Sequence, residues 1–264
     1  MEVRWHAATR DGTRLSAADY GGSGPGALLL HGLAGHAREW DSTAAWLART
    51  HRVVALEARG HGRSERARAD VSPEAFAADA AFWIERLELA PAVVVGQSLG
   101  GITALLLAAR RPDLVRALVA AEATPAHDPE APGAVRSWFA AWPLPFPSER
   151  EALAFFGGDT LRSRTWCAGL ERRADGLWPA FDAEVLLDVL GRANEHEHWD
   201  DWARIRCPAL VVRAADGVPA AEVQRMADAL PGTTVAEIED AGHDVHLDQP
   251  DHWRAAVQLF LTGL

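Results

Sequence analysis

The feature that most constrains the fold is a short stretch in which an apolar run ends at a Gly-x-Ser-x-Gly turn. Residues 93–95 are three consecutive valines, and a mostly apolar segment typical of a helix follows at residues 102–110. A run of β-branched residues is typical of a buried strand. The chain therefore passes from a buried strand into a helix through the five residues 96–100, and Ser98 lies at the corner.

The small residues on either side of Ser98 have a chemical consequence. Gly96 and Gly100 let the strand and the helix pass close together, so the serine hydroxyl is exposed while its backbone is strained. The next amide, that of Leu99, lies at a helix N-terminus, where unpaired N–H groups and the helix dipole favour negative charge. We therefore interpret Ser98 as a nucleophile beside an anion-binding site.

Short apolar runs alternate with helix-like segments along most of the chain. Besides the strand before Ser98, these runs cover residues 27–30, 53–56, 114–121, 209–212 and 233–238. Residues 3–6 and 14–20 flank the turn dipeptide Asp11-Gly12 and predict an opening hairpin. The alternation predicts an α/β protein with a mostly parallel sheet that is covered by helices on both faces.

Residues 124–204 interrupt this alternation. They contain no convincing strand and several prolines, and they hold six of the eleven tryptophans: Trp138, Trp142, Trp166, Trp178, Trp199 and Trp202. Structureless loops of this length are uncommon in compact domains, so we predict a helical cap inserted into a core domain made of residues 1–123 and 205–264. Aromatic side chains of the cap would make a pocket above Ser98 apolar.

His243 is the candidate base. It lies in the segment Asp240-Ala241-Gly242-His243-Asp244, directly after the last predicted strand. An imidazole with an ordinary pKa of roughly 6.5 can accept the serine proton and later return it to a leaving group near neutral pH. A serine on a strand-to-helix turn, followed downstream by an acid and then a histidine, is the chain order that this chemistry requires.

Two carboxylates are candidates for orienting His243. Asp216 follows the penultimate strand, although an Asp-Gly pair is also a common turn. Glu122 ends the strand that comes after the Ser98 helix, where a carboxylate at the sheet edge has few structural reasons to be present. We favour Asp216 and keep Glu122 as the alternative.

A second oxyanion donor is expected after the first parallel strand. The apolar residues 27–30 run into His31-Gly32-Leu33, which lets the amide of Leu33 face the Ser98 corner together with the amide of Leu99. Loss of one such donor typically costs on the order of a hundredfold in rate. The candidates for lining the substrate pocket are His31, Trp40, Trp138 and Trp142.

Composition excludes several other classes of function. The formal net charge is −11, which argues against nucleic acid or an anionic membrane as a partner. All 26 basic residues are arginines, so a Schiff-base lysine, a pyridoxal-phosphate anchor and a P-loop lysine are absent. No Gly-x-Gly-x-x-Gly follows a strand, so a dinucleotide site has no support.

Metal binding and secretion also lack support in the sequence. The acidic and histidine residues at 195–198 alternate, so on a helix they face different directions, and we predict no metal site and no cofactor. Cys167 and Cys207 are too few for a disulfide framework. The N-terminus has no basic segment leading into an apolar one and no run approaches membrane-spanning length, so we expect a cytoplasmic protein.

Four short segments together resemble the motifs of the α/β-hydrolase fold superfamily: His31-Gly32, Arg59-Gly60-His61-Gly62-Arg63-Ser64, residues 96–101 and Gly242-His243. The resemblance implies an eight-stranded sheet, a cap inserted after the sixth strand, and a triad that acts through an acyl-enzyme. Within the superfamily the chain looks like the small bacterial esterases and the cofactor-free haloperoxidase-like and C–C-bond hydrolases. Haloalkane dehalogenases and epoxide hydrolases of this fold carry Asp as the nucleophile, whereas this chain has Ser98. Some of those dehalogenases place the acid at the position that Glu122 resembles.

The sequence therefore predicts a serine hydrolase, and we expect a carboxylesterase that acts on a small apolar ester. In this prediction Ser98 is the nucleophile, His243 the base and Asp216 the acid. The alternatives are a C–C-bond hydrolase or lyase on the same scaffold, or a ligand-binding protein that keeps the fold without catalysis. We expect a small-molecule substrate as the partner, and a monomer or homodimer.

Overall fold

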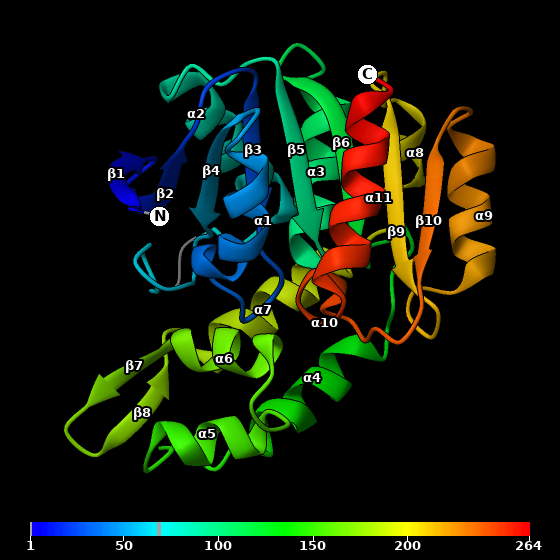
Figure 1. Ribbon diagram of the computed structural model, residues 1–264. Coiled ribbons are helices and arrows are strands. Elements are labelled where there is room, and N and C mark those ends of the chain that lie inside the picture. The colour runs from blue at the N-terminus through cyan, green and yellow to red at the C-terminus, as the bar shows by residue number, and fades with distance from the viewer. Residues whose placement is uncertain (1, 68–69) are drawn as a thin grey trace.

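The computed structural model describes residues 2–67 and 70–264. A central sheet lies between two layers of helices, and a second group of helices with a small hairpin lies beyond one edge of these layers (Figure 1). The eight strands have the order β1-β2-β4-β3-β5-β6-β9-β10. The β1–β2 and β2–β4 pairs are antiparallel and all other pairs are parallel. The prediction of a mostly parallel eight-stranded sheet is confirmed.

The elements of this body have the following bounds. The strands are β1 (Arg4–Arg10), β2 (Thr13–Gly21), β3 (Gly26–Leu30), β4 (Arg52–Glu57), β5 (Ala92–Gln97), β6 (Val115–Ala121), β9 (Ala209–Ala214) and β10 (Thr234–Ile238). The helices are η1 (Ala37–Trp40), α1 (Asp41–Leu47), α2 (Pro73–Arg86), α3 (Leu99–Arg110), α8 (Trp199–Ala203), α9 (Ala220–Ala229), α10 (Val245–Asp248) and α11 (Pro250–Thr262). None of the helices in the described ranges is long and apolar enough to cross a bilayer.

Each face of the sheet buries its own apolar cluster, because successive side chains of a strand point to opposite faces. In β3, Leu28 and Leu30 pack on the side of α2, α3 and α9. Ala27 and Leu29 pack on the opposite side, against α1 and α11. Burial on both faces is typical of parallel strands in α/β proteins, which explains why the sequence shows continuous apolar runs there.

The chain leaves the sheet after β6 and returns at β9, and most of the intervening residues form the cap (Figure 1). Its elements are α4 (Ala131–Ala140), α5 (Glu149–Phe155), α6 (Leu161–Ala168), β7 (Leu170–Arg173), β8 (Gly176–Pro179) and α7 (Ala183–Ala193). The insertion after the sixth strand agrees with the prediction. The short β7–β8 hairpin was not predicted, because the sequence of β7, Leu-Glu-Arg-Arg, carries no apolar pattern.

The last residues of the predicted cap belong to the body. Helix α8 packs against α3, and Trp202 is fully buried in the cluster beneath α2 and α3. The Trp202 indole donates a hydrogen bond to the carbonyl of Met226 at 2.8 Å, which fixes α8 to α9. The sequence could not separate α8 from the cap, because both lack strands and are rich in tryptophan.

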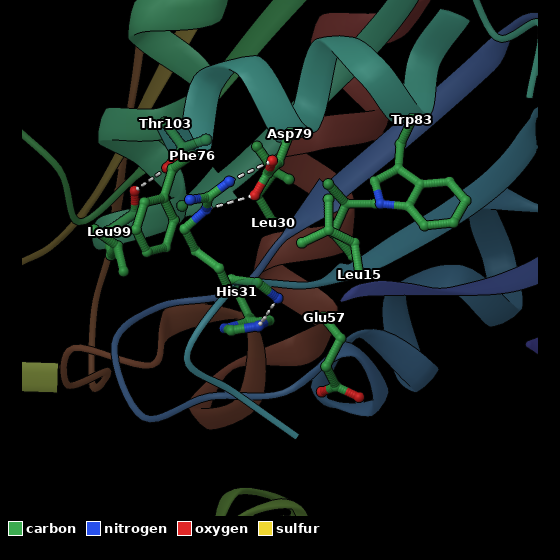
Figure 2. A pocket seen from close by; sticks show the side chains of 13 residues that line it. Leu15, Leu30, His31, Glu57, Phe76, Asp79, Trp83, Leu99 and Thr103 are labelled. Carbon is green, nitrogen blue, oxygen red and sulfur yellow. Dashed lines mark hydrogen bonds and ion pairs between the residues drawn. The ribbon is translucent and has the colours of Figure 1, made fainter. Parts of the chain in front are cut away.

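A buried ion pair joins the loop after β4 to helix α2. The guanidinium of Arg59 donates from Nε and Nη2 to the two carboxylate oxygens of Asp79, both at 2.7 Å, and the two side chains are 3% and 8% exposed. Figure 2 shows Asp79 among the side chains that line a small cavity, together with Leu15 and His31. The volume of this cavity is about 20 Å³. Two parallel bonds satisfy both charges, which a buried pair requires.

Candidate active site

Ser98 lies between β5 and α3 in a backbone conformation that is rare for a residue with a side chain, with φ +52° and ψ −117°. Such a conformation costs of the order of 1–3 kcal/mol and persists only where the surroundings enforce it. Close packing at Gly100 helps to enforce it here, because a Cβ at this position would lie 2.1 Å from the carbonyl oxygen of Leu30. The strained corner that the sequence motif predicts is therefore present.

Two amides near Ser98 have no acceptor within the described residues: that of Leu99, the first residue of α3, and that of Leu33, in the loop after β3. This loop is held from behind, because the amide of Ala34 donates to Nε2 of His61 at 3.3 Å. Burial lowers the pKa of His61 to about 3, so its ring stays neutral and can accept this bond. Leu33 and Ser98 line the same cavity.

His243 follows β10 and lines the same cavity. Its Nδ1 lies 3.2 Å from Oε2 of Glu122, and its carbonyl accepts a hydrogen bond from Nε2 of Gln97 at 2.8 Å. Burial lowers the pKa of His243, but the hydrogen bond to Glu122 and the charges of Asp244 and Glu122 outweigh it, so the pKa lies above the ordinary 6.5. The surrounding protein desolvates the ring only in part, since the side chain is 58% exposed and lines the cavity.

The carboxylate behind His243 is Glu122 and not Asp216. Glu122 directly follows β6 with φ +49°, and its side chain is only 2% exposed. Its Oε1 accepts the amide of Ala214 at 2.7 Å, which leaves Oε2 for the imidazole. Asp216 is exposed in the loop after β9, and within the described ranges no hydrogen bond joins it to His243. The geometry thus corrects our first choice and gives this position to the alternative.

The residue after Asp216, Gly217, explains the difference between the predicted acid and the one in the structure. At Gly217 a Cβ would lie 2.2–2.5 Å from the Glu122 carboxyl atoms, so only glycine leaves room for this side chain. Of the Asp216-Gly217 pair, the glycine is therefore the residue that matters for the site. The sequence has an acid, Asp216, after the penultimate strand, whereas in the structure the Glu122 carboxyl occupies the space beside Gly217.

A cavity of about 540 Å³ lies above Ser98, between the body and the cap. Its cap wall is largely aromatic, formed by Trp138, Phe155, Phe156 and Trp166. Within the described residues, Arg162 of α6 is the arginine in the lining.

Of the four predicted pocket residues, only Trp138 lines this cavity. Trp142 is buried inside the cap, where its ring packs against other aromatic rings. Trp40 is fully buried and stacks on His246 with ring centroids 4.3 Å apart. His31 is a structural residue, because its Nε2 accepts the amide of Ala58 at 3.0 Å.

Several of the pocket residues that the sequence did not reveal come from α5 and α6. Phe155 and Phe156 are adjacent at the end of α5, and Arg162 and Trp166 are four residues apart on α6. The spacing of the α6 pair is the signal that could have placed both on one helix face.

Helix α6 also contacts the segment that carries His243. The indole of Trp166 donates to Oδ2 of Asp244 at 3.0 Å, and Nε of Arg162 lies 3.4 Å from Oδ1 of Asp248. The other oxygen of Asp248 accepts the amide of Gly242 at 2.9 Å. The cap thus contacts two residues that follow His243, and one of them, Asp248, also holds the amide of Gly242 just before it.

The fold and the strained serine define an α/β hydrolase, and comparison with known proteins agrees. The sequence profile described as the alpha/beta hydrolase family matches residues 27–257, so the chain belongs to this family. The predicted superfamily is confirmed.

Several characterised relatives are similar over most of their length. The chain is 31% identical to an esterase of Mycobacterium tuberculosis, over 93% of this chain and 84% of the relative. It is 26% identical to 2-(acetamidomethylene)succinate hydrolase of Mesorhizobium japonicum, over 92% and 90% of the two chains. It is 29% identical to an sn-1-specific diacylglycerol lipase of Mus musculus, over 90% and 81%.

Solved structures show the same fold. The crystal structure of E-2-(acetamidomethylene)succinate hydrolase superimposes with a TM-score of 0.90, at 23% identity, over 99% of this chain and 100% of that one. An enol-lactonase from Burkholderia xenovorans has a TM-score of 0.80 at 22% identity, over 97% and 100%.

Proposed function

We propose that this hydrolase is a carboxylesterase that acts through an acyl-enzyme on Ser98. One observation carries the proposal: a strained serine and a histidine face one cavity, and the histidine is hydrogen-bonded to the buried carboxylate of Glu122. A nucleophile, a base and a group that orients the base are the three parts that acyl transfer requires.

In the proposed reaction the Ser98 hydroxyl attacks the ester carbonyl while Nε2 of His243 accepts its proton. Glu122 holds the ring through Nδ1 and stabilises the imidazolium that forms. The amides of Leu33 and Leu99 bind the oxyanion of the tetrahedral intermediate. When the intermediate collapses, the carbon–oxygen bond to the alcohol breaks and His243 gives the alcohol its proton. Water then attacks the acyl-enzyme in the same way, with His243 as the base, and the carboxylic acid is released while Ser98 regains its proton.

The cavity supports a small, partly apolar substrate. Its volume of about 540 Å³ lies within the range of typical small-molecule sites. The aromatic wall formed by Trp138, Phe155, Phe156 and Trp166 favours an apolar acyl or alcohol group.

Arg162 favours a second candidate, a hydrolase whose substrate carries a carboxylate beside the scissile bond. Its guanidinium keeps donors available, since its contacts to Asp248 and to the carbonyl of Phe156 are both 3.4 Å long. Arginine binds carboxylates through paired hydrogen bonds. The relative from Mesorhizobium japonicum is named for a succinate derivative.

Turnover of phenyl pentanoate and of monophenyl succinate by wild type and Arg162→Gln separates the two candidates. If the substrate carries a carboxylate, Arg162→Gln should lower the turnover of monophenyl succinate and leave that of phenyl pentanoate unchanged.

Labelling with a fluorophosphonate probe tests the nucleophile. We expect one covalent adduct on the folded protein, mapped to Ser98 by mass spectrometry, and none on Ser98→Ala or on heat-denatured protein. An unlabelled Ser98 in folded protein contradicts the proposal. Labelling without turnover across a panel of aryl esters retains the nucleophile and overturns the ester specificity, which leaves C–C-bond cleavage as the alternative.

A further inference from the structure

A buried polar pair that the proposed reaction does not use lies beneath the active-site loops. Glu39 in η1 and His246 in α10 are 7% and 1% exposed. Oε1 of Glu39 and Nε2 of His246 are 3.4 Å apart. Within the described residues, neither Oε1 of Glu39 nor either ring nitrogen of His246 has a hydrogen-bond partner. Buried polar atoms are nearly always bonded, so this pair calls for an explanation.

The Glu39 carboxyl packs against the loop that carries Leu33. Its Oε2 accepts the amide of His36 at 3.3 Å, and a Cβ on Gly35 would lie 2.3 Å from the same oxygen. The His36 ring in turn bonds the carbonyl of Thr165 in α6 at 2.9 Å. Glu39 therefore holds one end of the Leu33 loop.

His246 belongs to the segment on the other side of the site. It follows His243 by three residues and stacks on Trp40, which directly follows Glu39, with an angle of 24° between the ring planes. The Glu39–His246 contact is thus a direct side-chain link between the Leu33 loop and the His243 segment.

Burial favours the neutral form of both members of this pair. Burial raises the pKa of Glu39 to about 8 and lowers the pKa of His246 to about 4. Within the described residues no arginine pairs with Glu39, since Arg38 pairs with Asp41 and Arg164 with Asp159. The charged or titratable groups near the pair include His36 beside η1, and Asp244, Asp248 and His243 in and beside α10. Glu57 of β4 and Tyr20 of β2 face η1 from the sheet, where they bond the amide and the carbonyl of Ala37.

We propose that Glu39 is a positioning residue, a neutral carboxylic acid that fixes the Leu33 loop against the segment carrying His243. Its Oε2 accepts the His36 amide, and a proton on Oε1 can be donated to Nε2 of His246. A neutral acid makes both contacts without placing a charge in the interior. The inference rests on the proposed function, because it gives Leu33 and His243 their roles in the reaction.

Glu39→Gln and Glu39→Ala test the positioning role. Glutamine keeps one acceptor, one donor and no charge, so kcat and KM on an aryl ester should stay within about twofold of wild type. Alanine removes both contacts, and we expect kcat to fall about tenfold or more while KM changes little, because misplaced catalytic groups slow the chemical step. Arg38→Gln, an exposed change in the same short helix, is the matched control. A Glu39→Ala enzyme with wild-type kcat overturns the positioning role.

The pH dependence of unfolding tests the neutral state without reference to activity. In the unfolded chain Glu39 ionises near its ordinary pKa of 4.5, whereas in the folded chain it keeps its proton up to about pH 8. The unfolded state then binds fewer protons, so this residue makes wild type less stable as the pH rises from 4.5 to 8. The unfolding midpoint of Glu39→Gln should therefore rise relative to wild type between pH 5 and pH 8. If the difference between the unfolding midpoints of Glu39→Gln and wild type stays constant or shrinks over this pH range, Glu39 is not a neutral acid. The same conclusion follows if kcat of Glu39→Gln is as low as kcat of Glu39→Ala.

These outcomes are distinct from failure of the proposed function. If Ser98 of wild type is not labelled by a fluorophosphonate, the catalytic roles fail. The unfolding comparison still decides the protonation state of Glu39, because it needs no substrate.

Discussion

Nδ1 of His243 lies 3.2 Å from Oε2 of Glu122, although the two residues are 121 positions apart in the chain. The carboxylate beside the imidazole therefore follows β6, which is paired with the strand that leads into Ser98, and the last residue of β9 supplies a backbone donor to it. The amide of Ala214 holds Oε1 at 2.7 Å while Oε2 faces the imidazole. One oxygen of the buried carboxylate thus binds the backbone, and the other contacts the imidazole.

Separate substitution of the two candidate acids tests this arrangement. Glu122→Gln should lower kcat on an aryl ester by about 10³-fold, because an amide cannot stabilise the imidazolium and favours the wrong ring tautomer. Asp216→Asn should keep kcat within about twofold, since substitution of an exposed residue without a partner in the site has little effect. Steady-state kinetics of the two variants decide the matter, and an activity loss confined to Asp216→Asn would refute the assignment.

Gly217→Ala should act at a distance from the reacting atoms. Its Cβ would lie 2.2–2.5 Å from the Glu122 carboxyl, so the carboxyl has to move away from His243. We expect kcat to fall about tenfold or more with a small change in KM. Gly191→Ala is the control, because a Cβ there meets nothing within 4 Å and alanine favours the helix. Equal kcat values for the two variants would contradict the prediction.

The pH profile of kcat/KM should report His243. Only the neutral imidazole accepts the serine proton, so the rate rises as the pH increases through a pKa that lies above 6.5. Glu122→Gln removes a hydrogen bond and a charge that raise this pKa, and the acidic limb of the residual activity should move to lower pH. Asp216→Asn should leave the limb in place. A limb that does not move in Glu122→Gln would show that the carboxylate has no electrostatic effect on the histidine.

Asp79→Asn should destabilise the fold because it leaves the buried Arg59 charge without its partner. Removal of one member of a buried ion pair typically costs about 3–5 kcal/mol. Chemical denaturation gives the free energy of unfolding, and Asp113→Asn is the control, because the pair that Asp113 forms with Arg111 is exposed and should contribute little. Similar stability of the two variants would mean that Arg59 finds another partner.

The sequence predicted those parts of the site that local patterns encode. The apolar run before Gly96 and the helix after Gly100 dictate a corner at Ser98, whatever the rest of the chain does. His243 was found because it follows the last strand in a short Gly-containing loop. Both predictions depend on a few adjacent residues.

The parts that the sequence did not predict depend on contacts between distant segments. The choice between Glu122 and Asp216 turns on the space beside Gly217, which no local pattern shows. Glu39 resembles an ordinary surface residue of a short helix until His246 is placed next to it. The roles of Trp40 and Trp142 were misjudged for the same reason, since a tryptophan buried in a core and one lining a pocket look alike in a sequence.

The bonds from α6 to Asp244 and Asp248 bear on how such an enzyme can be re-engineered. A cap exchanged for that of a relative would take Trp166 and Arg162 away from the segment that holds His243. The cap of this protein is therefore not a detachable module. A chimera has to carry matching residues around α10, or the segment that carries His243 loses these contacts.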